Sequence, residues 1–178
     1  MNNNKIIAET ERLILRRYNN DDLQDLYEYL SSPRVVEYEP YKIMTMDEVK
    51  KTLEYRISSE EFIAVELKEN HKMIGNVYLG KREFESLEIG YVFNDKYWKQ
   101  GYAKESCEKL IEEVFKNGIH RIFAECDPNN ENSWKLLEKV SFEREGELKQ
   151  NVYFWRDVDN CPIWKDTFIY ARLNNSNI

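Results

Sequence analysis

Three consecutive segments in the middle of the chain restrict the fold more than any other feature of the sequence. "FIAVEL" (62–67) and "MIGNVYLG" (73–80) are rich in β-branched and aromatic residues, and the polar stretch "KENHK" between them is typical of a hairpin turn. "SLEIGYVF" (86–93) follows closely and is largely apolar, as expected for a central strand. The pattern therefore predicts three adjacent antiparallel strands.

The rest of the chain alternates between strand and helix patterns. Alternating apolar and basic residues predict a strand at 12–18, and "TMDE" at 45–48 is a possible capping box for a helix. We interpret 31–41 as an ordered loop or a short helix. We expect further strands at 121–127, around 142–155 and at 163–173. We also expect four helices: one at 21–30, which follows Asn20, one at 45–59, one that runs from 103 to a C-cap at Gly118, and one at 132–140.

This order of elements mixes hairpins with one strand–helix–strand crossover. Such an order implies an α/β (α+β) fold, in which a mixed, largely antiparallel sheet of about seven strands is flanked by about four helices. The 178 residues contain no internal repeat and no linker-like stretch. We therefore expect a single domain that spans residues 1–178.

Composition excludes several classes of function. A net charge of −7 argues against nucleic acid as the main partner, and the short apolar runs predict no membrane span. The N-terminus lacks the apolar core of a secretory signal. Three widely spaced cysteines fit the reducing cytoplasm, and two distant histidines make a metal site improbable, so we expect no metal. The acidic charge mildly favours a cationic substrate, although solubility alone would also account for it.

The stretch "NDKYWKQGYAKES" (94–106) places two small residues, Gly101 and Ala103, where a helix begins. Free backbone N–H groups at a helix N-terminus bind anions, and nearby lysines would assist. The alternative is a tight turn that only serves the helix. The stretch matches neither of the common glycine-rich phosphate loops, so by itself it does not decide between these interpretations.

A second segment, "DPNNENSWKLLEKVSFEREG" (127–146), adds to this signal. Together with "WKQGYA" (98–103), the sequence resembles the GCN5-related N-acetyltransferases (GNAT), most closely the subgroup that includes the ribosomal-protein N-terminal acetyltransferases. The first family motif, [QR]-x-x-G-x-[GA], is matched except at Trp98. The second, N-x-x-S-x-x-[LV]-x-E-K-x-G-F, is matched by Asn130, Ser133, Leu136, Glu138, Lys139 and Phe142.

The two ends of the chain, "ETERLILRRY" and "WKDTFIYARL", are also similar to the ends of this subgroup, so the resemblance covers nearly the whole sequence. It implies an N-acetyltransferase with a splayed central strand pair, in which an amine directly attacks acetyl-coenzyme A (acetyl-CoA). The backbone of 99–104 would hold the pyrophosphate. The implied cofactor contacts are Val92, Phe93, Asn94, Trp98, Lys99, Gln100, Gly101, Tyr102, Ala103, Lys104, Asn130 and Ser133.

The resemblance also suggests the catalytic groups. Glu88, just before the splayed segment, is the candidate base, with a structural ion pair as the alternative. Many relatives carry a tyrosine as general acid where this chain has Leu137, and in the subgroup the serine that corresponds to Ser133 is proposed for that task. The alternative for Ser133 is a small residue packed near the coenzyme, and the alternative for Asn130 is a helix cap. Ser141 replaces the usual glycine before the phenylalanine, which costs roughly 1 kcal/mol if that position is left-handed.

The acceptor is the least determined part of the prediction. An α-amine with a pKa near 7.7–8.0 is far easier to deprotonate than a lysine near 10.4, which favours a protein N-terminus. A small-molecule amine such as an antibiotic or polyamine is the alternative, and a coenzyme A-binding module without turnover is another. A homodimer is among the partners that we allow for. The candidate acceptor-site residues are Tyr38, Tyr41, Trp155 and Trp164.

Overall fold

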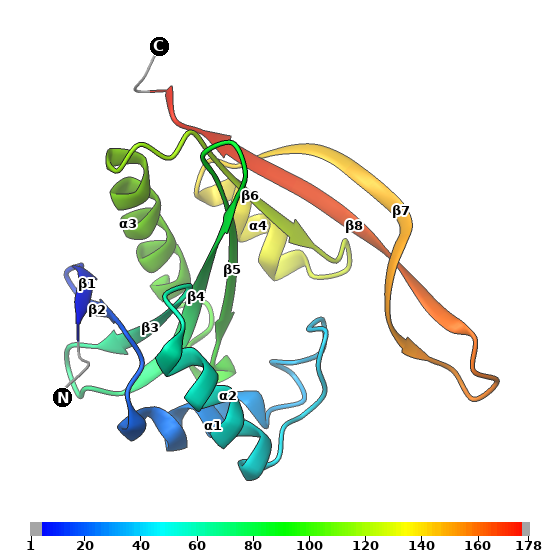
Figure 1. Cartoon of the computed structure of the whole chain (residues 1–178), viewed down its shortest axis with the longest axis horizontal. Coiled ribbons are helices and arrows are strands. Elements are labelled where there is room, and N and C mark those ends of the chain that lie inside the picture. Colours follow the sequence, from blue (N-terminus) through cyan, green and yellow to red (C-terminus); the bar gives the residue numbers. More distant parts are fainter. Residues whose placement is uncertain (1–4, 176–178) are drawn as a thin grey trace.

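The structure of the protein, a computed structural model, describes residues 5–175 and contains an eight-stranded sheet. The strand order is β1-β2-β3-β4-β5-β6-β8-β7 (Figure 1). The strands are β1 (Ile6–Glu9), β2 (Leu13–Arg16), β3 (Phe62–Leu67), β4 (Met73–Arg82), β5 (Ser86–Phe93), β6 (Arg121–Cys126), β7 (Glu143–Arg156) and β8 (Pro162–Leu173). The α-helices in the described part are α1 (Leu23–Leu30), α2 (Met46–Ser58), α3 (Tyr102–Lys116) and α4 (Glu131–Lys139).

Antiparallel pairing dominates the sheet, as the sequence predicts. β1 to β5 form a continuous antiparallel series, and β7 and β8 form a long hairpin that pairs with β6 through β8. The one parallel pair in the described sheet joins β5 to β6, because helix α3 carries the chain across between them. The predicted α/β fold with a mixed, largely antiparallel sheet is therefore confirmed.

Two details at the N-terminal end differ from the prediction. The strand predicted at 12–18 is present as β2, and a further strand, β1, pairs with it to form a hairpin, which gives one strand more than the seven expected. β1 has only four residues, too short for its alternation to be recognised. Asn19, rather than Asn20, forms the N-terminal cap, and a 3-10 turn precedes α1. Residues 31–41 form turns and bends without a helix, so the first of the two predicted alternatives, an ordered loop, is confirmed.

Other local predictions are confirmed by the backbone. Thr45 and Glu48 form the predicted capping box at the start of α2. Helix α3 ends at the predicted point, where Gly118 has a φ of 88° that suits glycine. Ser141 has a φ of 64°, so the left-handed position that the usual glycine would fill is occupied here by serine, with a penalty of roughly 1 kcal/mol.

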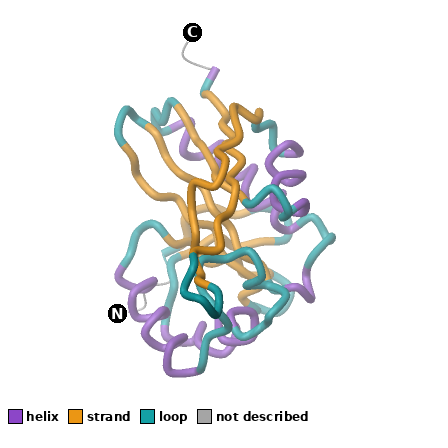
Figure 2. The backbone as a smooth tube through the Cα atoms, turned by 90° about the vertical axis from the view of Figure 1, so that its right-hand side faces the viewer, coloured by secondary structure: helices purple, strands orange, loops and turns teal. Residues whose placement is uncertain are grey.

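Two apolar clusters cover opposite faces of the sheet. Side chains of β5 alternate between them: Leu87, Ile89 and Phe93 pack with α3 and α4, whereas Val92 packs with α1 and α2. Figure 2 shows the strands with helices on both sides. From Asn76 onward in β4, and along β5, the even-numbered residues face α1 and α2, and this division determines which side chains can reach the functional site.

The central parallel strands are splayed. β5 and β6 pair only from Ser86 to Glu88 and from Arg121 to Phe123. Beyond these residues β5 stays paired with β4 and β6 stays paired with β8, so the two strands separate. The predicted splayed strand pair is thus present, and it leaves one edge of β5 without a strand partner from Ile89 to Phe93.

Candidate functional site

A cavity of about 1160 Å³ lies at the gap between β5 and β6. The start of α3, the start of α4 and the ends of β5 and β6 line one part of it. Segment 35–44, α2 and the α2-facing side chains of β3 and β4 line another part. The cavity thus reaches both faces of the sheet, because the missing strand pairing opens a passage between them.

Most of the predicted site residues line this cavity. They are Tyr38, Tyr41, Glu88, Val92, Phe93, Trp98, Lys99, Gly101, Tyr102, Ala103, Lys104, Asn130 and Ser133. The other four candidates do not line it. Asn94 is buried and accepts a hydrogen bond from Lys96 N, and the Gln100 side-chain amide donates to the Lys96 carbonyl. The Trp155 ring lies against the ammonium group of Lys42, and the half-exposed Trp164 packs on Tyr153.

The backbone at the start of α3 has the geometry of an anion site. Lys99 and Gly101 have φ values of 61° and 86°, and the first helical hydrogen bond runs from Glu105 N to Gly101 O. The N–H groups of Tyr102, Ala103 and Lys104 therefore have no acceptor within the helix. The positive φ at position 101 favours glycine over residues with a side chain, and a Cβ there would lie 3.4 Å from Arg12 Nη2.

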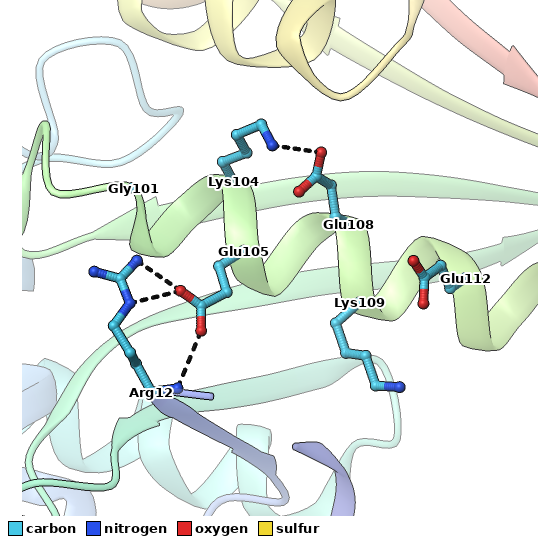
Figure 3. Close-up of a pocket in the computed structure, with 7 residues that line it drawn as sticks. All are labelled: Arg12, Gly101, Lys104, Glu105, Glu108, Lys109 and Glu112. Carbon is cyan, nitrogen blue, oxygen red and sulfur yellow. Dashed lines mark hydrogen bonds and ion pairs between the residues drawn. The ribbon is translucent and has the colours of Figure 1, made fainter. Parts of the chain in front are cut away.

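Arg12 does not line the large cavity but holds this loop from a separate pocket beside α3, which Figure 3 shows. Its guanidinium bonds to Glu105, with Nε 2.7 Å from Oε2, and Nη1 donates to the Gln100 carbonyl at 3.1 Å. The same group lies 4.4 Å from the centre of the Tyr102 ring. Arg12 belongs to the turn between β1 and β2, so the N-terminal hairpin fixes the backbone conformation of the loop.

The open edge of β5 offers main-chain hydrogen-bonding groups. Asn94 N donates to Ile74 O on β4, and alternate residues of a strand point their N–H and C=O groups in opposite directions. The main-chain groups of Ile89, Tyr91 and Phe93 therefore point away from β4 toward the gap. Trp98 Nε1 donates to the Phe93 carbonyl at 2.8 Å, so this carbonyl already has a partner. The main-chain N–H and C=O groups of Ile89 and Tyr91 therefore remain available to a ligand in the gap.

Asn130 and Ser133 meet at the start of α4. The Asn130 side chain caps the helix by accepting from Ser133 N at 3.2 Å, so the helix-cap interpretation of Asn130 is correct and both residues also line the cavity. Leu137 is buried in the core and has no polar group to offer.

Tyr91 is a candidate that the sequence did not reveal. Its hydroxyl donates to the Ser133 carbonyl at 2.8 Å and lies 3.2 Å from Ser133 Oγ. Burial raises the pKa of Tyr91 well above its usual value, so the phenol keeps its proton. Within "IGYVF" this tyrosine looks like any other aromatic residue of a strand.

Glu88 lies at the point where the strands separate. It pairs with Gly80 and Phe123 and forms an ion pair with Arg82. Desolvation and the nearby Glu88 carboxylate raise the pKa of Glu125 on β6, against the effect of Arg82. The alternative considered for Glu88, a structural ion pair, is thus present, and its role as base stays a prediction.

The part of the cavity next to α2 contains ionisable groups that sequence reasoning missed. Arg56 is buried there beside Asn76, and Glu39 and Tyr41 lie at the same end. Burial raises the pKa of Glu39 to about 7, although a hydrogen bond with Tyr41 and the charge of Arg56 act in the opposite direction. Tyr38 lies nearby, 5.8 Å from the ammonium group of Lys165.

Residues 5–175 contain neither a metal-binding cluster nor a membrane-spanning helix. No group of histidine, cysteine and acidic side chains in that part of the chain has the arrangement of a metal site. None of its helices is long and apolar enough to cross a membrane.

The splayed sheet and the cavity at the start of α3 define an acyltransferase-type fold, and comparison with known proteins identifies the family. Residues 12–143 match the family described as Acetyltransferase (GNAT) domain, and the chain belongs to this family of acetyl-transferring enzymes. The membership predicted from the two motifs is confirmed.

Several relatives span nearly the whole chain. An uncharacterised N-acetyltransferase of Bacillus subtilis, YnaD, is 32% identical and the match covers 92% of this chain and 95% of that protein. A GNAT-family acetyltransferase structure from Bacillus anthracis has a TM-score of 0.85 at 29% identity, over 94% of this chain and 98% of the other. A ribosomal-protein-S5-alanine acetyltransferase from Vibrio fischeri has a TM-score of 0.76 at 25% identity, over 95% and 97%.

Proposed function

We propose that this enzyme transfers the acetyl group of acetyl-CoA to a primary amine by direct attack of the amine on the thioester. The observation that carries the proposal is the single cavity that joins three features: the unpaired N–H groups of α3, the open edge of β5, and Ser133 on α4. An extended molecule with a pyrophosphate at one end, amides in the middle and a thioester at the other fits these features in that order.

The cofactor is held mainly by main-chain groups. The N–H groups at the start of α3 bind the pyrophosphate, assisted by the helix dipole and by Lys99, which has no ion-pair partner among the described residues. Lys96 and Lys104 are engaged with Glu28 and Glu108. The amides of the pantetheine arm pair with Tyr91 and its neighbours on β5, as an added strand would.

The chemical step needs a group that takes a proton and a group that gives one. Glu88 faces the α2 side of the gap and receives the proton of the attacking amine through water. Ser133 donates a proton toward the departing sulfur, and Tyr91 holds Ser133 in place through its contacts with both oxygens of that residue. Because the Tyr91 phenol stays protonated, it acts as a hydrogen-bonding partner of Ser133 and does not take its proton.

For the acceptor we favour an α-amine. The similarity to the ribosomal-protein-S5-alanine acetyltransferase supports a peptide N-terminus, and a small-molecule amine is the alternative. The third option, a binding module without turnover, is weakened by the Tyr91–Ser133 pair, which supplies hydroxyl groups despite the buried Leu137. We place the enzyme in the cytoplasm, a proposal supported by the free thiols of Cys107, Cys126 and Cys161.

Binding is tested by thermal unfolding with acetyl-CoA. At 100 times its Kd a ligand adds about 2.7 kcal/mol, a shift of several degrees, and we expect this shift with acetyl-CoA but not with ATP or NAD. Gly101→Val should abolish it. Gly118→Val is the matched control, because Gly118 has a similar φ of 88° at the other end of α3 with open space around it. Equal shifts in both variants would remove the cofactor role of Gly101.

Turnover tests the residue roles. With a panel of peptides and small amines, Glu88→Gln and Ser133→Ala should lower kcat by more than threefold without comparable loss of acetyl-CoA binding, because acid–base assistance contributes roughly 10²–10⁴-fold. The Glu88→Gln defect should be relieved as pH rises, and the Ser133→Ala defect should not. Tyr91→Phe should resemble Ser133→Ala. Unchanged kcat in all three would leave positioning as the source of catalysis.

A further inference from the structure

Arg56 lies in the wall of the cavity on the α2 side and has an unusual environment for a buried charge. Arg56 is only 5% exposed, and its side chain extends from α2 toward Asn76 on β4. An arginine side chain does not lose its proton in proteins, so this is a permanent positive charge. Such charges are rarely buried without an anion beside them.

Neutral groups hold the guanidinium in place. Nη1 donates to Tyr18 Oη at 2.9 Å, to Tyr29 Oη at 3.1 Å and to Asn76 Oδ1 at 2.9 Å. The group also lies 4.8 Å from the centre of the Phe62 ring. Nε and Nη2 form no hydrogen bond with any residue that the structure describes. The orientation of the guanidinium is therefore fixed while two of its nitrogens have donors to spare.

No carboxylate of residues 5–175 forms an ion pair with Arg56. The acidic residue that shares this end of the cavity is Glu39, which is hydrogen-bonded to Tyr41 and has its pKa raised to about 7 by burial. Near neutral pH Glu39 is therefore protonated in a large part of the molecules. The described chain thus leaves the positive charge of Arg56 without a full counter-charge, in a cavity that is open to a ligand.

We propose that Arg56 binds a carboxylate of the acceptor, so that the substrate is a primary amine with a carboxylate in the same molecule. This rests on the proposed function. Asn76, which touches Arg56, pairs with Val92, and Glu88 lies on the same face farther along β5. At about 3.4 Å per residue, the carboxylate lies on the order of 13 Å from the strand position of Glu88. The acceptor is therefore elongated, like a short peptide, rather than the size of glycine.

Two sources of this carboxylate are compatible with the spacing. One is the free C-terminus of a small peptide-like amine, and the other is an aspartate or glutamate side chain close behind a protein N-terminus. Both present the same planar pair of oxygens, which matches two N–H donors of a guanidinium. The substrates below are chosen so that they separate the two sources.

The test compares matched acceptors that differ only in charge. Ala-Gly-Gly is compared with its C-terminal amide, and an N-terminal peptide with glutamate at its second or third position is compared with the same peptide containing glutamine. We expect wild-type kcat/KM to be at least tenfold higher for the acid of one pair. That pair identifies the source of the carboxylate. Equal rates within both pairs would overturn the proposal, and so would a higher rate with 3-aminopropyl phosphate than with any of the acids.

Variants of Arg56 then separate recognition from folding. Arg56→Met should lower kcat/KM for the preferred acid at least fivefold more than it lowers kcat/KM for the neutral partner. Arg56→Lys should retain part of the preference. An equal loss with acid and neutral acceptor would make Arg56 a structural residue and overturn the proposal. If Arg56→Met does not fold, the wild-type comparison decides by itself.

The same experiments distinguish this proposal from the proposed function. The acetyl-CoA shift in thermal unfolding should persist in Arg56→Met, because the residues that hold the cofactor lie at the start of α3. If wild-type enzyme showed neither this shift nor turnover of any amine, the proposed function would fail. If it showed both without a preference for acids, only the inference about Arg56 would fail.

Discussion

Two arginines of this protein are equally buried and have opposite surroundings. Arg16 on β2 and Arg56 on α2 are each 5% exposed. Arg16 donates two hydrogen bonds to Asp22, at 2.9 and 2.7 Å, and forms an ion pair with Glu66. Arg56 bonds only to two phenols and an amide within the described chain. The degree of burial alone therefore does not indicate whether a charged side chain stabilises the fold or binds a ligand.

The difference follows from where the two side chains lie. Arg16 joins β2 and β3 to the turn before α1 and does not line the large cavity. Its counter-charges come from the chain itself, so the cluster is complete without a ligand. Arg56 lines the cavity, and the anion that would complete its cluster is not supplied by residues 5–175. The first arrangement serves the fold, and the second is suited to binding.

The largest expected effect is on stability at Arg16. Arg16→Met should lower the free energy of unfolding by about 3–5 kcal/mol, because Asp22 would stay buried without a counter-charge and Glu66 would keep only its contact with His71. Urea denaturation measures this value. Neutralising the acids in the same variant, with Asp22→Asn and Glu66→Gln, should restore much of the loss. A loss below 1 kcal/mol for Arg16→Met would mean that the two buried arginines do not differ as described.

A smaller loss is expected at Arg56. Arg56→Met should cost about 1–3 kcal/mol, the penalty for hydrogen bonds lost by neutral groups. Tyr29 would still donate to Asn76 at 2.9 Å, so this pair stays satisfied without the arginine. Measured in the same urea series, a loss as large as that of Arg16→Met would show that Arg56 has a hidden counter-charge in the folded chain.

The third effect depends on pH and concerns Glu39. Burial raises the folded pKa of Glu39 from 4.5 to about 7, so the folded state holds this proton more tightly than the unfolded state does. The contribution of Glu39 to stability is therefore fully present below pH 4.5 and is lost as pH rises through about 7. Glu39→Gln should flatten this decline in melting temperature between pH 5 and 8. Parallel curves for the two proteins would contradict the assignment.

Much of the fold was predictable because its signals are local. The hairpins of β3, β4 and β5, the capping box of α2 and the glycines at both ends of α3 each depend on a few neighbouring residues. The short strand β1 was missed because its pairing with β2, rather than its own four residues, defines it.

The site was predictable only in part, for a related reason. The motifs around Gly101 and Ser133 led to the part of the cavity at α3 and α4. Tyr91 and Arg56 were not found, because their significance lies in contacts with residues distant in the sequence, such as Ser133 and Asn76. Trp155 and Trp164 were predicted for the acceptor site, and they lie outside the cavity.

The open edge of β5 has a consequence for how such a site evolves. Where a cosubstrate is recognised by main-chain N–H and C=O groups, every residue type except proline offers the same donors and acceptors. The residue types along that edge can then differ between relatives as long as the backbone conformation of the strand is preserved. Relatives with 25–32% identity can share the fold over almost their whole length under such a rule. Relatives would then retain the course of the backbone, while the side chains along this edge differ between their sequences.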